Sequence, residues 1–114
     1  MPSDAALTAL RDIAYHIDLA GQFAAGLDAD TFKADLRTVY AVTRCLEIIS
    51  EASRRLPDEL KAQHPSIAWK EMAGAGNIYR HDYEDVVASY VWVTVHDHLP
   101  PLRVVIGHEL ARRG

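Results

Sequence analysis

Hydrophobic residues recur at steps of three and four along most of this chain, which is the spacing of amphipathic helices. The segment 5–20 is the first example, and Ser3 or Asp4 is available to cap its start. One face of this predicted helix carries Leu7, Leu10, Ile13, Ala14 and Ile17. The segment is therefore expected to bury that face against the rest of the protein.

A longer stripe with the same spacing follows a short turn that Asp28 or Asp30 can cap. It ends at Arg55, because Pro57 cannot continue a helix. Its apolar members are Leu36, Val39, Tyr40, Val42, Thr43, Leu46, Ile49 and Ala52. We expect one long helix over this stretch.

Shorter elements follow. Residues 57–60 predict a helical turn that His64-Pro65 stops, and another short helix is expected to begin near Ser66 or Trp69. The small residues 73–76, Ala-Gly-Ala-Gly, allow a bend before the polar cluster at 77–83.

The segment 84–98 has helical spacing, although residues 91–95, Val-Trp-Val-Thr-Val, are also typical of a strand. Because its neighbours are helical, we expect a helix, ended by Leu99-Pro100-Pro101-Leu102 before a last helix. The last helix is predicted to run through Val105, Ile106 and Leu110. The whole pattern indicates an all-α, four-helix-type antiparallel bundle with short extra helices.

Composition agrees with one compact unit. A chain of 114 residues with 49% hydrophobic content can bury a core without metals or disulfides, so we expect residues 1–114 to form a single domain. The first residues carry no basic region followed by an apolar run, and no stretch reaches the length of a membrane span, so a cytoplasmic protein with no membrane partner is expected. Cys45, the only cysteine, lies on an apolar helical face and is interpreted as a core residue.

The formal net charge of −4 argues against a general nucleic-acid coat protein, but it leaves room for a local basic site. Residues 77–83, Asn-Ile-Tyr-Arg-His-Asp-Tyr, are the best candidate. On a helix Asn77 and His81 share a face, with Arg80 beside them, whereas Tyr83 needs a bend to join His81.

An amide, an imidazole and a guanidinium suit RNA cleavage without a metal or other cofactor. A base removes the ribose 2′-hydroxyl proton, cations stabilise the phosphate, and an acid protonates the leaving 5′-oxygen. One histidine does not easily serve as acid and base together, so a homodimer presenting two copies of His81 is expected. The alternative is a solvated polar patch or a helix-cap network.

Several segments in this order resemble the HepT-like HEPN ribonucleases. They are residues 41–52, residues 69–74, Asn77 with His81-Asp82-Tyr83, and Trp92 with residues 99–102. The resemblance implies an HEPN-type helical fold. It also implies a toxin that acts on RNA as a homodimer, paired with an MntA-type nucleotidyltransferase antitoxin.

The family signature is an arginine, four to six residues, then histidine, any residue and tyrosine. By this resemblance His81 is catalytic, and Tyr83 is the residue that the antitoxin modifies with AMP. The arginine position is Gly76 here, which transfers the phosphate-stabilising role to Arg80. The other interpretation is a disabled nuclease that binds a nucleotide or the nucleotidyltransferase.

Arg44, Glu47 and Glu51 share a helical face at steps of three and four. We interpret them as an intrahelical salt-bridge set or part of a dimer seam, and as supporting residues if this face lines the groove of His81. Residues 96–98, His-Asp-His, are a weak metal signal without a third partner at a known spacing, so no metal site is predicted.

The remaining histidines and aromatic residues are assigned structural roles. His16, His64 and His108 are scattered, and each is expected to face solvent or to form local hydrogen bonds. Base stacking is open to the large aromatic residues, but packing is the favoured interpretation for Trp69, Trp92, Tyr40 and Tyr90. Arginine pairs near helix ends are expected to complement the helix dipole, with contact to RNA phosphates or to a partner as the alternative, at Arg54-Arg55 and Arg112-Arg113.

Overall fold

The computed structural model describes residues 2–75 and 84–113, and their side chains over 4–75 and 87–113. The described residues form helices and no strand. The long helical segments are α1 (Pro2–Ala24), α3 (Leu36–Ser53), and a consecutive run of α7 (Glu84–Val93), η1 (Thr94–His98) and α8 (Leu99–Arg113). Shorter helices lie between them: α2 (Ala29–Ala34), α4 (Asp58–Ala62) and α5 (Trp69–Gly74). The all-α, HEPN-type bundle is confirmed, and residues 91–95 are helical.

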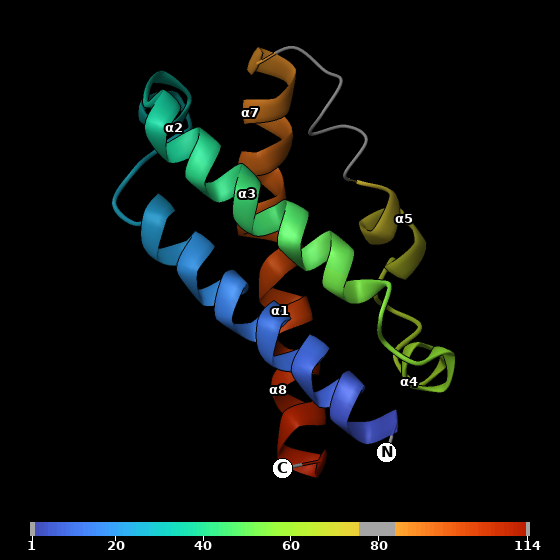
Figure 1. Ribbon diagram of the computed structural model, residues 1–114. Helices are drawn as coiled ribbons and strands as arrows, with labels where there is room; N and C mark the ends of the chain where they lie inside the picture. The colour runs from blue at the N-terminus through green and yellow to red at the C-terminus, as the bar shows by residue number, and fades with distance from the viewer. Residues whose placement is uncertain (1, 76–83, 114) are drawn as a thin grey trace.

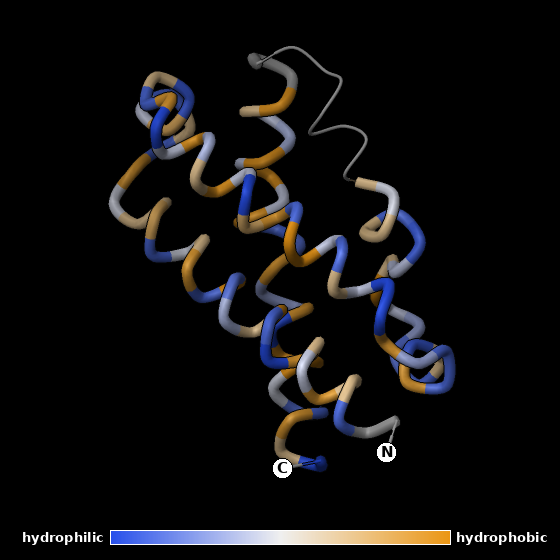
Figure 2. The backbone as a smooth tube through the Cα atoms, in the orientation of Figure 1, coloured by the Kyte–Doolittle hydropathy of each residue, from blue (hydrophilic) through white to orange (hydrophobic). Residues whose placement is uncertain are grey.

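Helices α1 and α3 lie antiparallel, side by side, and the α7–η1–α8 run crosses behind both (Figure 1). The short helices α4 and α5 lie beyond the C-terminal end of α3 and beside it, respectively (Figure 1). Polar and apolar segments alternate along α1 and α3 (Figure 2), as expected for helices buried on one side. The core forms where these buried faces meet.

The core consists mainly of the residues that the periodic pattern selects. Leu10 and Ile13 of α1, Val42 of α3 and Ile106 of α8 are completely inaccessible to solvent. Phe32 of α2 joins them, and its ring packs against Trp92 with 5.3 Å between ring centroids. The α2 helix therefore closes one end of the bundle.

The turn between α1 and α3 follows from its polar residues. Gly26 has φ +80°, a conformation that side chains with a Cβ rarely adopt. Asp28 caps α2, since its carboxylate accepts the Thr31 N–H at 2.8 Å and the Thr31 hydroxyl accepts the Asp28 N–H at 2.9 Å. These bonds to Thr31 lower the pKa of Asp28. The predicted capping role of Asp28 is confirmed.

The start of α1 differs from the expectation. The helix begins at Pro2, so Ser3 and Asp4 lie inside its first turn and are not its cap. Proline fits this position because the first N–H groups of a helix have no intrahelical acceptor and its fixed φ is already helical.

The expectation that Leu99-Pro100-Pro101-Leu102 ends the preceding helix is wrong. Helix α8 begins at Leu99 and contains both prolines. The turn before it is a π-helix, in which the Leu99 N–H donates to the Thr94 carbonyl, one residue further back than in an α-helix. The wider turn accommodates rings that would otherwise clash with the carbonyl four residues earlier.

Candidate functional site

The predicted catalytic residues Asn77, Arg80 and His81 lie outside the described residues, as do the predicted modification site Tyr83 and Gly76. The described chain positions both ends of this segment. Helix α5 leads into it and α7 leaves it, and both helices contact α3.

Two side chains of α3 hold the end of α5. The Ser50 hydroxyl donates to the Ala73 carbonyl at 3.1 Å, and the Arg54 guanidinium donates to the same oxygen through Nε at 3.1 Å. The last carbonyls of a helix lack intrahelical donors, and a cation there also complements the helix dipole. The Arg54 side chain thus serves the end of a neighbouring helix, α5. The direction in which the chain enters the segment 76–83 is set from α3.

A pocket of about 510 Å³ lies beside this anchor. Its walls are mostly apolar, and its residues come from α3, from the chain between α4 and α5, and from α5, α7, η1 and α8. Tyr90, Thr94 and His98 follow one another at four-residue steps along one wall. The rest of the lining consists of Leu46, Ile49, Ser66, Ile67, Ala68, Glu71, Met72, Ala75, Leu99, Pro101 and Leu102. The pocket therefore reaches Ala75, the last described residue before the predicted catalytic cluster.

The π-helix η1 forms part of this pocket wall. Its side chains use carbonyls of the turn before it: the Thr94 hydroxyl donates to the Tyr90 carbonyl at 2.8 Å, and His96 Nδ1 donates to the Trp92 carbonyl at 2.8 Å. Single π-turns inside helices occur frequently at functional sites.

The aromatic residues that sequence reasoning grouped together have separate places. The Trp92 ring packs against His96 at a centroid distance of 3.8 Å and against Phe32. The Trp69 indole N–H donates to the carbonyls of Lys61 and His64, at 3.1 and 3.0 Å. Packing roles are confirmed for both tryptophans, whereas Tyr90 lines the pocket.

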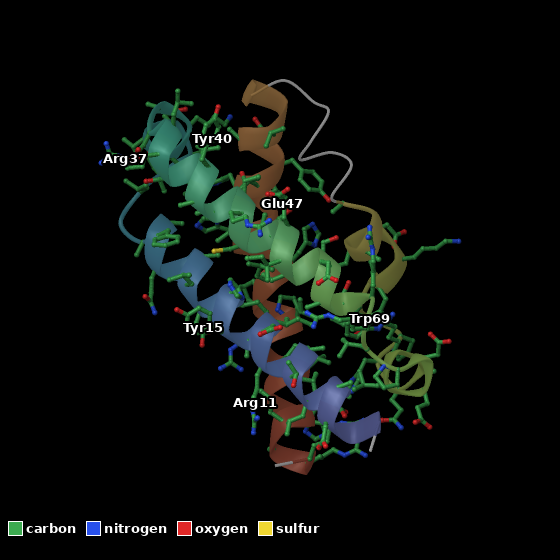
Figure 3. The ribbon with its side chains drawn as sticks, in the orientation of Figure 1. Arg11, Tyr15, Arg37, Tyr40, Glu47 and Trp69 are labelled. Carbon is green, nitrogen blue, oxygen red and sulfur yellow. The ribbon has the colours of Figure 1, made fainter. Side chains whose placement is uncertain are left out.

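The supporting residues Arg44, Glu47 and Glu51 lie on the outward face of α3. Figure 3 shows Arg37, Tyr40 and Glu47 along this helix, with Arg11 and Tyr15 on α1. Glu51 pairs with Arg55 at 3.3 Å, and Arg55 also reaches Asp12 of α1 at 3.2 Å.

The predicted salt-bridge set is therefore wrong for Arg44 and Glu47. Within residues 4–75 and 87–113, neither has an ion pair shorter than 4.0 Å. Helical spacing permits an Arg44–Glu47 pair on this face, but the ion pairs that form here are those of Arg55 with Glu51 and with Asp12 of α1.

Sequence reasoning missed a buried charged cluster at the end of α8. Glu109 is 0% exposed, and its carboxylate accepts hydrogen bonds from His64 at 2.8 Å, Arg112 at 3.1 Å and Arg113 at 3.3 Å. The spacing of Glu109 could have revealed it. Leu102, Ile106 and Glu109 follow one another at steps of four and three, so the Glu109 carboxylate lies on the same buried face of the helix as the two apolar residues. His64 is locally hydrogen-bonded, as expected, but to a partner distant in sequence.

The remaining predicted chemistry is structural where it is described. Cys45 is buried, and burial raises the pKa of its thiol, which disfavours a nucleophilic thiolate. His16 Nδ1 bonds the Asp12 carbonyl at 2.7 Å. In the part of the chain that the structure describes, no three His, Cys, Asp or Glu side chains are grouped to hold a metal ion.

The family model "Ribonuclease HepT-like" matches residues 9–108, a range that includes α3, α5 and the segment 76–83. The chain belongs to the HepT-like ribonuclease family.

Relatives of known name support the assignment. The chain is 39% identical over 94 residues to "Probable ribonuclease HepT" of Thermococcus cleftensis, covering 82% of this chain and 86% of that protein. It is 33% identical over 94 residues to "Putative RNase MJ0125" of Methanocaldococcus jannaschii, covering 82% and 81%. It is 35% identical over 77 residues to "Putative RNase TTE0752" of Caldanaerobacter subterraneus, covering 68% and 69%. No solved structure matches this chain.

None of the helices among the described residues combines the length and the apolar character that a membrane crossing requires.

Proposed function

We propose that this HepT-like protein is a metal-independent endoribonuclease that acts as a homodimer. The observation that carries the proposal is the family match across residues 9–108, which includes His81 and Tyr83 in their signature spacing. The anchoring of α5 by Ser50 and Arg54 supports it, because a reaction of this kind needs its groups held in fixed positions.

In the proposed reaction His81 of one copy removes the 2′-hydroxyl proton of the RNA ribose. The 2′-oxygen attacks the adjacent phosphorus while the bond to the 5′-oxygen breaks, and the partner's His81 donates a proton to that oxygen. Arg80 stabilises the negative charge on the phosphate, the role that the arginine at the Gly76 position has in the family signature. Asn77 donates a hydrogen bond to the same group.

The direct experiment compares purified wild type with His81→Ala and Arg80→Ala on single-stranded RNA in the presence of a metal chelator. Each substitution should reduce cleavage by about 100-fold or more, the scale of general acid–base and charge-stabilising groups. His108→Ala and Arg11→Ala are matched controls on the described surface and should cleave like wild type. Background cleavage by all five proteins would contradict the nuclease proposal.

We further propose that the protein is a toxin whose partner is an MntA-type nucleotidyltransferase, which transfers AMP from ATP to the Tyr83 hydroxyl and releases pyrophosphate. Incubation with such an enzyme and ATP should add one AMP group to the wild type and none to Tyr83→Phe, as measured by mass spectrometry of peptides. Modification should also reduce RNA cleavage, because AMP adds bulk and negative charge two residues from His81. Unmodified Tyr83, or modification elsewhere, would contradict this part of the proposal.

A second function has one observation in its favour. Gly76 occupies the signature arginine position, and loss of a phosphate-stabilising cation favours a module that binds a nucleotide or the nucleotidyltransferase without cutting RNA. Inactive wild type that still binds the nucleotidyltransferase would support this alternative.

A further inference from the structure

Helix α3 carries a continuous outward stripe, which we call the α3 stripe. Residues at steps of three, four and seven share one helix face. The opposite face of α3 is buried in the core. The members of the α3 stripe are Arg37, Tyr40, Arg44, Glu47, Ile48 and Glu51 of α3, together with Arg55, two residues past its end.

Two features of the α3 stripe are unusual for a solvated surface. Tyr40 is 59% exposed, and exposed aromatic residues and arginines are enriched where proteins bind one another. Arg44 is exposed and has no ion pair within the described residues, although Glu47 lies three residues away on the same helix. Glu51 pairs with Arg55 through its Oε2 atom. The Oε1 atom of Glu51 can therefore bind a further cation.

Two pairs within the α3 stripe become complementary when the stripe is placed against its own reverse. If a second α3 lies antiparallel with the midpoint between Glu47 and Ile48, Arg44 faces Glu51 of the partner subunit. In the same register Tyr40 faces Arg55 of the partner subunit, an arginine-over-ring contact. Each pairing occurs twice because a two-fold interface repeats every contact.

We propose that the α3 stripe is the surface on which two copies of this chain associate, in the register that pairs Arg44 with Glu51. The inference rests on the homodimer of the proposed function and names its interface. Arg54, adjacent to the stripe, holds α5 through Ala73. The interface thereby adjoins the helix that leads into the predicted catalytic residues in both copies.

The charges of the α3 stripe favour binding of a second copy of this chain over binding of RNA. A phosphate backbone would be attracted to Arg37 and Arg44 but repelled by Glu47 and Glu51 in the same stripe. A stripe with both signs in self-complementary order instead fits an isologous protein interface.

Charge reversal tests the pairing. Arg44→Glu places a carboxylate opposite Glu51 of the partner subunit at both equivalent contacts of the homodimer, and Glu51→Arg places two arginines opposite one another. Each should raise the dimer dissociation constant by about tenfold or more, measured by analytical ultracentrifugation at low salt. Mixed in equal amounts, the two variants should form a heterodimer, because one contact is restored with reversed charges and the other is native.

Control variants distinguish an effect on dimer formation from an effect on folding. Arg11→Glu on α1 and Glu59→Arg on α4 reverse exposed charges outside the stripe and should leave the dimer unchanged. Circular dichroism should show helical content like wild type for every variant.

Three outcomes would overturn the inference: monomeric wild type, single variants that dimerise like wild type, or a mixture that stays monomeric while its components are folded. Because mass is measured without RNA, failure of the interface is distinct from failure of the nuclease. A dimer with this pairing but no cleavage leaves the inference standing and removes the proposed activity.

Discussion

His64 donates through Nε2 to Glu109 Oε2 at 2.8 Å, which joins the chain after α4 to the last turns of α8 across 45 residues of sequence. Glu109 is fully buried, and Arg112 and Arg113 supply further donors. Burial by itself raises the pKa of Glu109, but the hydrogen bonds from His64 and Arg113 and the charges of Arg112 and His64 outweigh it and lower the pKa below its usual value. The ionised carboxylate therefore stabilises the folded state.

Glu109→Gln should lower the free energy of unfolding near neutral pH by about 3 kcal/mol, because it removes the charge that these cations share. The sign of the pH effect follows from the lowered pKa. The contribution of Glu109 is fully present above the pKa of the unfolded chain and is lost as pH falls through the folded pKa. The free energy of unfolding is measured by urea unfolding followed by circular dichroism, from about pH 7 to about pH 3. As the pH falls, it should decrease less for Glu109→Gln than for wild type. Glu59→Gln, at an exposed position, is the control, and parallel curves for wild type and Glu109→Gln would refute the role of the cluster.

Gly76→Arg should increase RNA cleavage. It restores the cation of the family signature at the position before Asn77, so the phosphate gains a second positive group. We expect at least roughly tenfold faster cleavage if Arg80 replaces the missing arginine only in part. The matched control Gly74→Arg places the same charge at the end of α5, and equal rates in both variants would show that position does not matter.

Ser50→Ala should reduce cleavage more than it reduces stability. It removes one of the two side chains that donate to the Ala73 carbonyl, and Arg54 still satisfies that oxygen, so the cost in unfolding free energy is about 1 kcal/mol. The direction in which α5 ends is then less tightly held, which should lower kcat. Ser53→Ala is the comparison: this buried hydroxyl donates at 2.7 Å to the Ser50 carbonyl within α3. If both variants lose kcat equally, the anchor has no special role.

Cys45 should react with an aromatic disulfide reagent only after unfolding. The side chain is buried, and burial raises the pKa of its thiol, so the reactive thiolate is scarce in the folded protein. The labelling rate at increasing urea should follow the unfolded fraction measured by circular dichroism. Rapid labelling of the folded protein would contradict the assignment of Cys45 to the core.

The spacing of apolar residues was sufficient to predict the helices α1 and α3, because each helix buries one face and its apolar residues lie on that face. The same spacing was not sufficient to predict that the helix continues through Pro100 and Pro101. A local rule treats proline as a helix end, whereas the preceding π-turn, supported by packing, makes room for both rings. Glu109 was overlooked because a carboxylate normally lies in solvent. Arg112 and Arg113 lie at helical spacing from it, but His64 is 45 residues away in sequence and meets it only in the folded chain. The pairing of Arg55 was likewise decided by Asp12 on another helix.

The catalytic cluster was predicted from residue types, spacing and family signature. The family is confirmed, whereas the roles of His81, Arg80, Asn77 and Tyr83 stay predictions because they lie outside the described residues. Spacing alone could not indicate how α3 holds the end of α5. Ser50 and Ala73 are 23 residues apart, and the contact depends on how two helices pack.

The π-turn at Thr94–His98 also makes the length of this segment critical. Relative to an α-helix, such a turn is equivalent to one additional residue. Deleting a single residue there would remove the additional residue, so the turn would close as a regular α-helix and the residues that follow would keep their direction around the helix axis. Leu102, Ile106 and Glu109 would still face the core, but both prolines would face carbonyls in a narrower turn. A one-residue deletion in η1 should therefore disturb the start of α8 and leave its buried face in place.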